Sequence, residues 1–197
     1  MKTLRNISLL FLLIVSLVSS CVLRSLHPLY TENELILDDR LIGNYVVDGT
    51  DAWNISRANN QSQKNGDKLY RLEHVQNRDT VIFDLFLVKL DKYLYLDFFV
   101  DDYKSKNLEN EFAAFHLYPV HSFAKVSFKG NEIIINLFDS EYLGKLIEQN
   151  RIKISHEVAA EDILLTASPE ELQKFVIKYS DDENIFDDEP LILKPKV

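Results

Sequence analysis

The strongest constraint on this fold is a two-residue alternation of apolar and polar side chains that starts at Leu41 and continues for roughly a hundred residues. This alternation is typical of strands with one buried face. Turns such as Asp48-Gly49, Asp91-Lys92 and Lys129-Gly130-Asn131 are too short for crossover helices, so neighbouring strands should be antiparallel. The pattern predicts eight strands, at residues 42–48, 51–57, 69–75, 80–90, 93–100, 112–120, 122–129 and 131–138. We therefore expect an antiparallel up-and-down β-barrel of about eight strands.

The two central segments, residues 81–88 and 93–99, are apolar on nearly both faces. A barrel strand with one solvated face needs apolar residues only on its inner face. Another element should therefore cover the outer face of these two segments. Two helices predicted downstream can do so. Asp139 can cap the first, and Ser168-Pro169-Glu170-Glu171 is a capping box that begins the second. The fold class is thus mainly β with C-terminal helices, two short helices packing outside the barrel.

Two short segments near the end of the chain also have strand character. Residues 161–166 form a plausible strand before the second helix, and residues 191–193 can return as a last strand. Between them, residues 180–189 are strongly acidic. We expect a solvated loop held by Phe186 there, because the spacing of its carboxylates does not match a calcium-binding loop.

The charge of the chain excludes an unassisted nucleic-acid binder. The 197 residues contain 22 basic and 31 acidic side chains, and removal of the first twenty residues would take away Lys2 and Arg5, which lowers the net charge from −9 to −11. A hydrophobic fraction of 46% allows a real core in one domain. The single cysteine excludes a disulfide framework and a cysteine-based metal site.

The N-terminus is typical of a secretory signal. Lys2 and Arg5 precede an apolar run from Ile7 to Val18, which at about twelve residues is shorter than the roughly 20 that span a bilayer. The run leads into Val18-Ser19-Ser20-Cys21, which resembles the lipobox of bacterial lipoproteins. The resemblance implies that residues 1–20 are a signal peptide and that Cys21 becomes the acylated N-terminus, with chains such as palmitate. In that family a residue other than Asp after the cysteine, here Val22, implies the outer membrane of Gram-negative cells, facing the periplasm.

The first part of the mature chain differs from the alternating region that follows. Residues 21–40 are expected to be a lipidated N-terminus and a tether that docks part-way along the domain. Within it, Thr31 to Glu34 has the spacing of a capping box for one helical turn. Residues 41–197 then make up the barrel domain with its C-terminal helices.

The lipobox, the short tether, the run of strands and Gly43-Asn44-Tyr45 at the first strand together resemble the lipocalin-like lipoproteins of bacteria, within the calycin group of barrels. In that family the first strand usually reads Gly-x-Trp, whereas here Tyr45 occupies the Trp position and Trp53 follows one strand later. Residues 80–128 and 164–172 of this chain also resemble an uncharacterised group of lipoproteins that have a barrel followed by helices. It implies an architecture and no assigned activity.

Catalytic and metal-binding patterns are not evident in the sequence. His116 and His121 would face opposite ways on a regular strand, and no histidine pair has the spacing of a zinc site. No Gly-x-Ser-x-Gly elbow and no phosphate-binding loop is present. We therefore expect no metal, no cofactor and no enzymatic activity.

Aromatic side chains on the predicted strands give the remaining functional hypothesis. An eight-stranded barrel can hold one small ligand or be filled by its own side chains. The first case predicts a membrane-anchored envelope lipoprotein that binds a small apolar or amphipathic molecule; the second predicts a solid-core structural or protein-interaction module with an unknown partner. The candidate ligand-binding residues are Tyr45, Trp53, Phe83, Tyr95 and Phe115.

Overall fold

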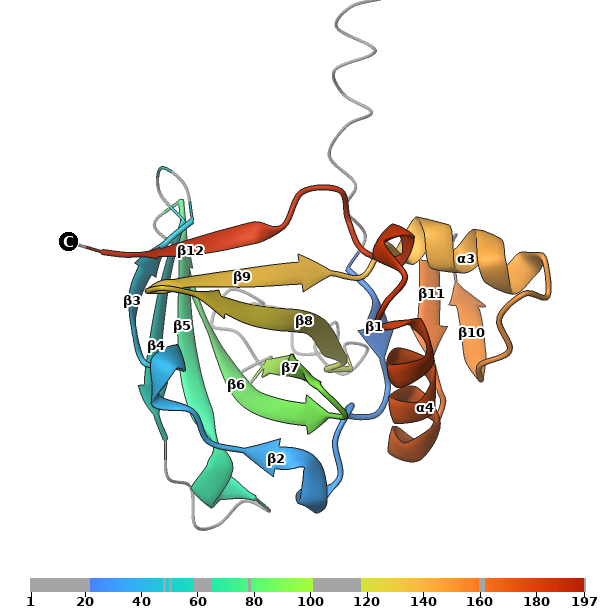
Figure 1. The fold of residues 1–197 in the computed structure, drawn as a ribbon, viewed down its shortest axis with the longest axis horizontal. Coiled ribbons are helices and arrows are strands. Elements are labelled where there is room, and N and C mark those ends of the chain that lie inside the picture. Colours follow the sequence, from blue (N-terminus) through green and yellow to red (C-terminus); the bar gives the residue numbers. More distant parts are fainter. Residues whose placement is uncertain are drawn as a thin grey trace, which may run out of the picture.

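The computed structural model describes residues 22–47, 49, 51–58, 65–77, 79–100, 118–159 and 162–196. Eight antiparallel strands close into a barrel (Figure 1). The prediction of a mainly β fold with a closed eight-stranded barrel and two C-terminal helices is confirmed. The barrel strands are β3 (Gly43–Val46), β4 (Ala52–Arg57), β5 (Tyr70–Gln76), β6 (Asp79–Leu90), β7 (Tyr93–Val100), β8 (His121–Lys129), β9 (Glu132–Leu137) and β12 (Leu191–Pro195).

The last strand, β12, closes the barrel. It pairs with β9, where Leu193 lies opposite Ile133, and with β3, where Lys194 lies opposite Val46. The strand expected at residues 112–120 falls mainly outside the described residues. Among the described strands, β7 pairs directly with β8, with Phe99 opposite His121. The C-terminal segment therefore supplies the eighth strand.

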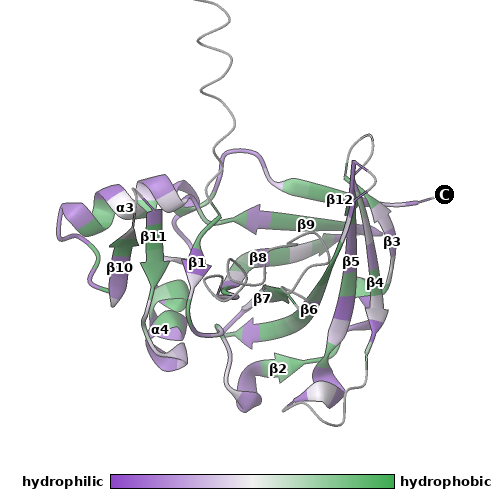
Figure 2. Ribbon diagram, turned by 180° about the vertical axis from the view of Figure 1, so that it is seen from behind, coloured by the Kyte–Doolittle hydropathy of each residue, from purple (hydrophilic) through white to green (hydrophobic). Residues whose placement is uncertain are grey.

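Alternate residues of the central strands face two different cores. On β6, Leu85 and Leu87 point into the barrel, whereas Phe86 and Val88 belong to a second core on its outer face. Apolar residues predominate along β6 and β9 (Figure 2). The double-sided hydrophobicity of the central strands thus has the predicted cause, which is a layer packed outside the barrel.

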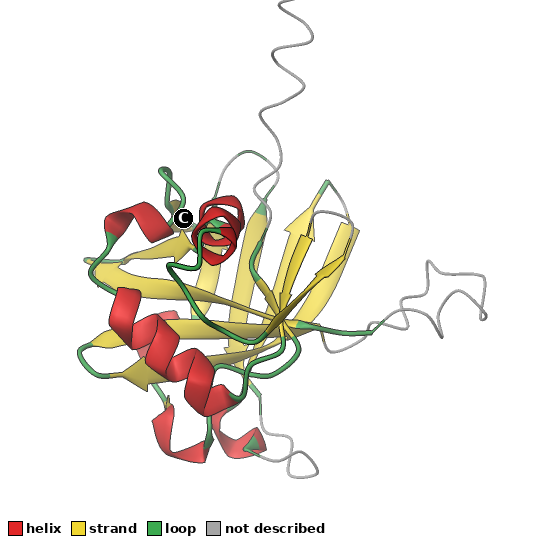
Figure 3. Cartoon of the chain, turned by 90° about the vertical axis from the view of Figure 1, so that its right-hand side faces the viewer, coloured by secondary structure: helices red, strands yellow, loops and turns green. Residues whose placement is uncertain are grey.

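Two helices form much of that layer, as Figure 3 shows from their side of the molecule. Helix α3 (Ser140–Glu148) begins at Asp139, whose carboxylate accepts a 2.8 Å hydrogen bond from the Tyr142 N–H. Helix α4 (Pro169–Tyr179) begins with the predicted capping box at Ser168. Both helices bury their apolar stripes in the outer core, so the capping and periodicity signals identified them correctly.

Helix α3 contains a glycine that packing explains. A Cβ atom on Gly144 would lie 3.0 Å from Cδ1 of Ile163. Ile163 belongs to β11 (Asp162–Leu165), which pairs with β10 (His156–Ala159). Glycine in a helix interior costs about 1 kcal/mol relative to alanine, and here it allows the helix to approach β11 closely.

Residues 22–40 pack along the domain through two short strands. Residues 24 and 25 form β1 (Arg24–Ser25), antiparallel to β8 and parallel to β11. A short strand, β2 (Leu35–Ile36), pairs with Leu87 and Val88 near the C-terminal end of β6. The 3-10 turn η2 (Glu32–Glu34) lies between β1 and β2 and has the predicted capping box at Thr31, and the 3-10 turn η3 (Asp39–Leu41) lies between β2 and β3.

Candidate functional site

The residues predicted to bind a ligand do not share one site. Tyr45 and Trp53 are buried in the barrel interior, and Phe83 packs against that interior while partly buried. Tyr95 lies on the outer face of β7 instead, in the outer core. Phe115 and the predicted lipid-attachment residue, Cys21, lie outside the described residues.

The described side chains of the barrel interior form a packed core. Trp53 and Phe98 meet edge to face with ring centroids 5.9 Å apart, and Phe83 lies in the same arrangement against Phe98 at 6.5 Å. Such T-shaped pairs are a favoured packing geometry. The buried members of this core are Leu41, Tyr45, Trp53, Ile55, Tyr70, Leu72, Leu85, Leu87, Leu96, Phe98, Ala124, Val126, Ile133, Ile135 and Leu193.

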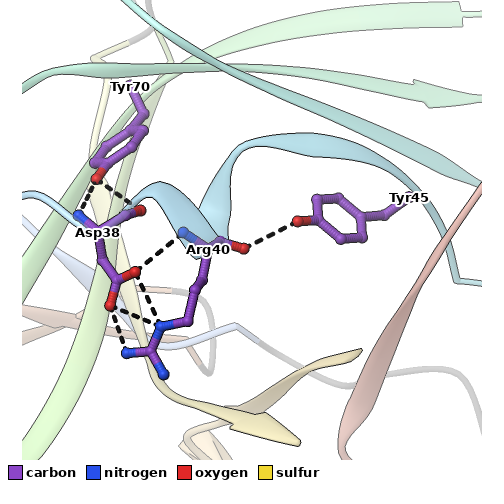
Figure 4. A network of polar contacts seen from close by, with 4 residues as sticks. All are labelled: Asp38, Arg40, Tyr45 and Tyr70. Carbon is purple, nitrogen blue, oxygen red and sulfur yellow. Dashed lines mark hydrogen bonds and ion pairs between the residues drawn. The ribbon is translucent and has the colours of Figure 1, made fainter. Parts of the chain in front are cut away.

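A polar network around η3 joins the N-terminal segment to the barrel strands β3 and β5 (Figure 4). The buried Tyr70 hydroxyl accepts a 2.6 Å hydrogen bond from the Asp38 N–H and lies 3.1 Å from the Asp38 carbonyl, to which it donates. Arg40 pairs with the Asp38 carboxylate at 2.5 Å, and its own carbonyl accepts a hydrogen bond from Tyr45 at 3.1 Å. A Cβ atom on Gly43 would lie 3.0 Å from the Tyr45 ring, so the glycine leaves room for the Tyr45 ring that takes part in this network.

Tyr95 has a structural role outside the barrel. Its hydroxyl lies 2.7 Å from the hydroxyl of Ser180, which in turn donates to the Val176 carbonyl at 2.6 Å. Burial raises the pKa of Tyr95 to about 12. The residue therefore joins the barrel wall to the end of α4.

A second set of chemically distinctive side chains lies on the outer face of β6, β7 and β8. Residues that lie opposite one another on the three strands form rows across the sheet, and two neighbouring rows each combine an acidic residue with aromatic rings. The first row is Asp84, Phe99 and His121, and the second is Phe86, Asp97 and Phe123. Carboxylates on a predominantly apolar face need hydrogen-bond partners, since burial of an unpaired charge is costly.

Asp97 is the centre of this arrangement. Its side chain is fully buried; one carboxylate oxygen accepts a 2.8 Å hydrogen bond from the Leu29 N–H, and the other lies 2.7 Å from Nδ1 of His121. Burial raises the pKa of Asp97, and the hydrogen bonds from His121 and Leu29 oppose that rise. When Asp97 is ionised it can only accept, so Nδ1 of His121 carries the proton and Nε2 is the atom left for other partners.

His121 lines an outer pocket of about 430 Å³. Within this pocket the Tyr30 and Phe86 rings are 4.7 Å apart, and the Phe99 and His121 rings are 4.5 Å apart. Burial raises the pKa of the Tyr30 phenol, and the charges of Asp97 and Asp84 raise it further. The pocket is lined by Pro28, Tyr30, Thr31, Glu32, Asn65, Phe86, Phe99, His121 and Pro169.

The N-terminal segment forms one wall of the outer pocket and is held by α4. Gln173 of α4 donates to the Leu29 carbonyl and to the Glu34 carboxylate, both at 3.1 Å. Glu34 also accepts hydrogen bonds from Thr31. Burial alone would raise the pKa of Glu34, but the hydrogen bonds outweigh it and the pKa is lowered. Residues far apart in sequence are thus fixed around one pocket, which favours a preformed site.

A polar pocket of about 510 Å³ lies near Lys125 and the acidic stretch. Lys125 donates to the Ser180 carbonyl at 2.8 Å and lies 3.9 Å from the centre of the Tyr93 ring, and burial lowers the pKa of its ammonium group. Phe186 is buried, as expected for the residue that holds this stretch. Among the described residues, no group of three or more His, Cys, Asp or Glu side chains is placed to hold a metal ion.

Comparison with known proteins finds no matching family model, no matching curated protein and no matching solved structure. The closed antiparallel barrel is consistent with a calycin or lipocalin-like architecture. In the described part of the chain, no helix has both the length and the apolar character needed to cross a membrane.

Sequence reasoning missed the residues that build the outer pocket. Asp97 was the available signal, because it is the one carboxylate within the apolar segment 93–99. His121 was considered only as a metal-site partner of His116, which lies outside the described residues. Tyr30 belonged to the expected tether, so nothing in the pattern placed it against β6.

Proposed function

We propose that this chain is a lipid-anchored protein of the cell envelope that binds a small amphipathic molecule in the outer pocket. The observation that carries the proposal is the combination of aromatic walls with a histidine held by the buried Asp97, in a pocket separate from the hydrophobic core of the barrel interior. Ligand sites are typically concave, mainly apolar and furnished with a few convergent polar groups, with volumes of about 300–1,000 Å³.

The lining of the outer pocket indicates the chemistry of the ligand. Tyr30, Phe86 and Phe99 offer apolar surface, while His121 and Asn65 offer hydrogen-bonding groups. A molecule with an apolar part and one hydrogen-bonding head group matches this division. The ligand is thus of the class proposed from the sequence, with its site on the outer face of the barrel.

The proposed anchor rests on the sequence. The basic start, the apolar run to Val18 and the lipobox-like end at Cys21 favour acylation of that cysteine. Each buried methylene of an acyl chain contributes about 0.8 kcal/mol, so two or more chains give stable attachment. Replacement of Cys21 by Ala should then release the protein from the membrane fraction, and retention of the variant in that fraction would contradict the anchor.

The second candidate function is a solid-core interaction module. The hydrophobic core of the barrel interior favours it, because a barrel packed with its own side chains can serve as a rigid scaffold without holding a ligand. Crosslinking in intact cells that traps one stoichiometric protein partner would support this role over ligand binding.

Ligand binding can be tested with the lipidated protein purified from its host. Native mass spectrometry should find a retained small molecule, and the emptied protein should take up a fluorescent fatty acid. Phe99→Ala removes one aromatic wall and should weaken uptake about tenfold, which corresponds to about 1.4 kcal/mol. Ile192→Ala is the control, because the Ile192 side chain on β12 is exposed and lies outside the pocket lining. Absence of retained ligand and of uptake would reject the proposal.

A further inference from the structure

The chain is fixed in the domain from Val22, the first residue after the proposed anchor. Val22 forms an antiparallel bridge with Asp139, the N-cap of α3. Leu23 is 1% exposed and belongs to the outer core. Arg24 and Ser25 then form β1, with β8 on one side and β11 on the other. The segment after Cys21 is therefore built into the fold from its first residue.

Several contacts beyond the strand pairing hold this segment in place. The Leu26 N–H donates to the Leu165 carbonyl at 2.8 Å, and Arg24 forms a 2.5 Å ion pair with Asp162. Ser25 is fully buried, and its hydroxyl donates to the His27 carbonyl at 2.7 Å. Release of the segment would break these bonds and expose Leu23, so β1 cannot act as a free spacer without a cost in stability.

We propose that a lipid bilayer is the partner of the surface around Val22 and Asp139, and that Cys21 holds the domain there with no spacer. The proposal rests on the proposed acylation of Cys21. A residue spans at most about 3.6 Å, so the single step from Cys21 keeps Val22 at the bilayer surface. Pro28 lies on the wall of the outer pocket. Even a fully extended chain from Cys21 to Pro28 would measure no more than roughly 25 Å, so the pocket is near the anchor.

The charge of this surface decides which membrane is the right probe. Asp139 and Glu141 lie at the start of α3, where Glu141 pairs with Lys145, and Asp162 pairs with Arg24. These residues carry no excess of positive charge, so the surface gains nothing from the negative potential of anionic lipids. The acyl chains on Cys21 are thus the source of attachment, and vesicles of zwitterionic phosphatidylcholine are the appropriate test membrane.

The distance from the membrane can be measured with one fluorescent label. The chain has no cysteine other than Cys21, so Ser140→Cys gives the acylated protein a single free thiol at the start of α3. The labelled protein is placed in phosphatidylcholine vesicles that carry a head-group nitroxide quencher. It is compared with a variant that has a flexible Gly/Ser insert of about twenty residues between Cys21 and Val22, long enough to let the domain move away.

We expect strong quenching in the natural chain and at least a twofold loss of quenching in the insert variant. The same insert added after Val197 is the matched control and should change nothing. Equal quenching with and without the N-terminal insert, on protein shown by mass spectrometry to be acylated, overturns the inference and leaves the anchor intact. Protein without an acyl group on Cys21 overturns both.

Discussion

The backbone N–H of Leu29 donates a 2.8 Å hydrogen bond to the carboxylate of Asp97, which lies 68 residues later in the chain and is fully buried on β7. The other oxygen of the same carboxylate is 2.7 Å from His121 on β8. One side chain thus fixes both the N-terminal segment and the histidine of the outer pocket.

Replacement of Asp97 by Ala should destabilise the protein by about 2–4 kcal/mol, because it leaves the buried Leu29 N–H and His121 without their acceptor. Urea unfolding measures the loss, and amide exchange at Leu29 should become faster. Glu73→Ala, at an exposed position on β5, is the control and should change stability by less than about 0.5 kcal/mol. A cost for Asp97→Ala as small as that of the control would show that the carboxylate does not hold the segment.

The pKa of Asp97 should lie above its ordinary value of 3.8, because burial disfavours the charged form. The protonated form is then favoured in the folded state, so the stabilising contribution of this group is present at low pH and is lost as pH rises from the unfolded-state pKa through the folded-state pKa. Titration of the Asp97 carboxyl carbon by NMR measures the midpoint directly. A midpoint below 3.8 would mean that the bonds from His121 and Leu29 outweigh burial.

Gly144 offers a test of the packing between α3 and β11. Alanine in a helix interior normally stabilises by about 1 kcal/mol relative to glycine, but here its Cβ would meet Cδ1 of Ile163 at 3.0 Å. Gly144→Ala should therefore fail to stabilise, or should destabilise. Ile163→Val removes the contacting methyl group, so Gly144→Ala in that background should recover most of the expected gain. Additive effects in this double-mutant cycle would exclude the contact as the cause.

Tyr70 should stabilise the junction between the N-terminal segment and the barrel through its hydroxyl. Tyr70→Phe leaves the Asp38 N–H without its 2.6 Å partner and should cost about 1–2 kcal/mol in thermal or urea unfolding. Tyr45→Phe is the matched comparison, since the Tyr45 hydroxyl makes longer bonds, at 3.1 and 3.3 Å. A larger loss for Tyr45→Phe than for Tyr70→Phe would contradict this ranking.

The fold was more predictable than the site because local patterns determine strands and helices. The short turn at Asp91-Lys92 between β6 and β7, the cap at Asp139 and the capping box at Ser168 each act over a few residues, and each prediction is confirmed. The pocket depends instead on contacts such as Leu29 with Asp97, and Gln173 with Leu29, which are set only when distant segments pack together. No periodicity along the chain encodes those contacts, so residues 22–40 resembled a tether.

The location of the ligand is the most direct test of the proposed function, and the single tryptophan makes it measurable. Trp53 lies in the barrel interior against Phe98, whereas the outer pocket is on the opposite face of β7. A brominated fatty acid, which quenches tryptophan at short range, should bind with little loss of Trp53 fluorescence, and Phe99→Ala should weaken that binding. Strong quenching of Trp53 together with binding unaffected by Phe99→Ala would place the ligand inside the barrel and contradict the outer-pocket site.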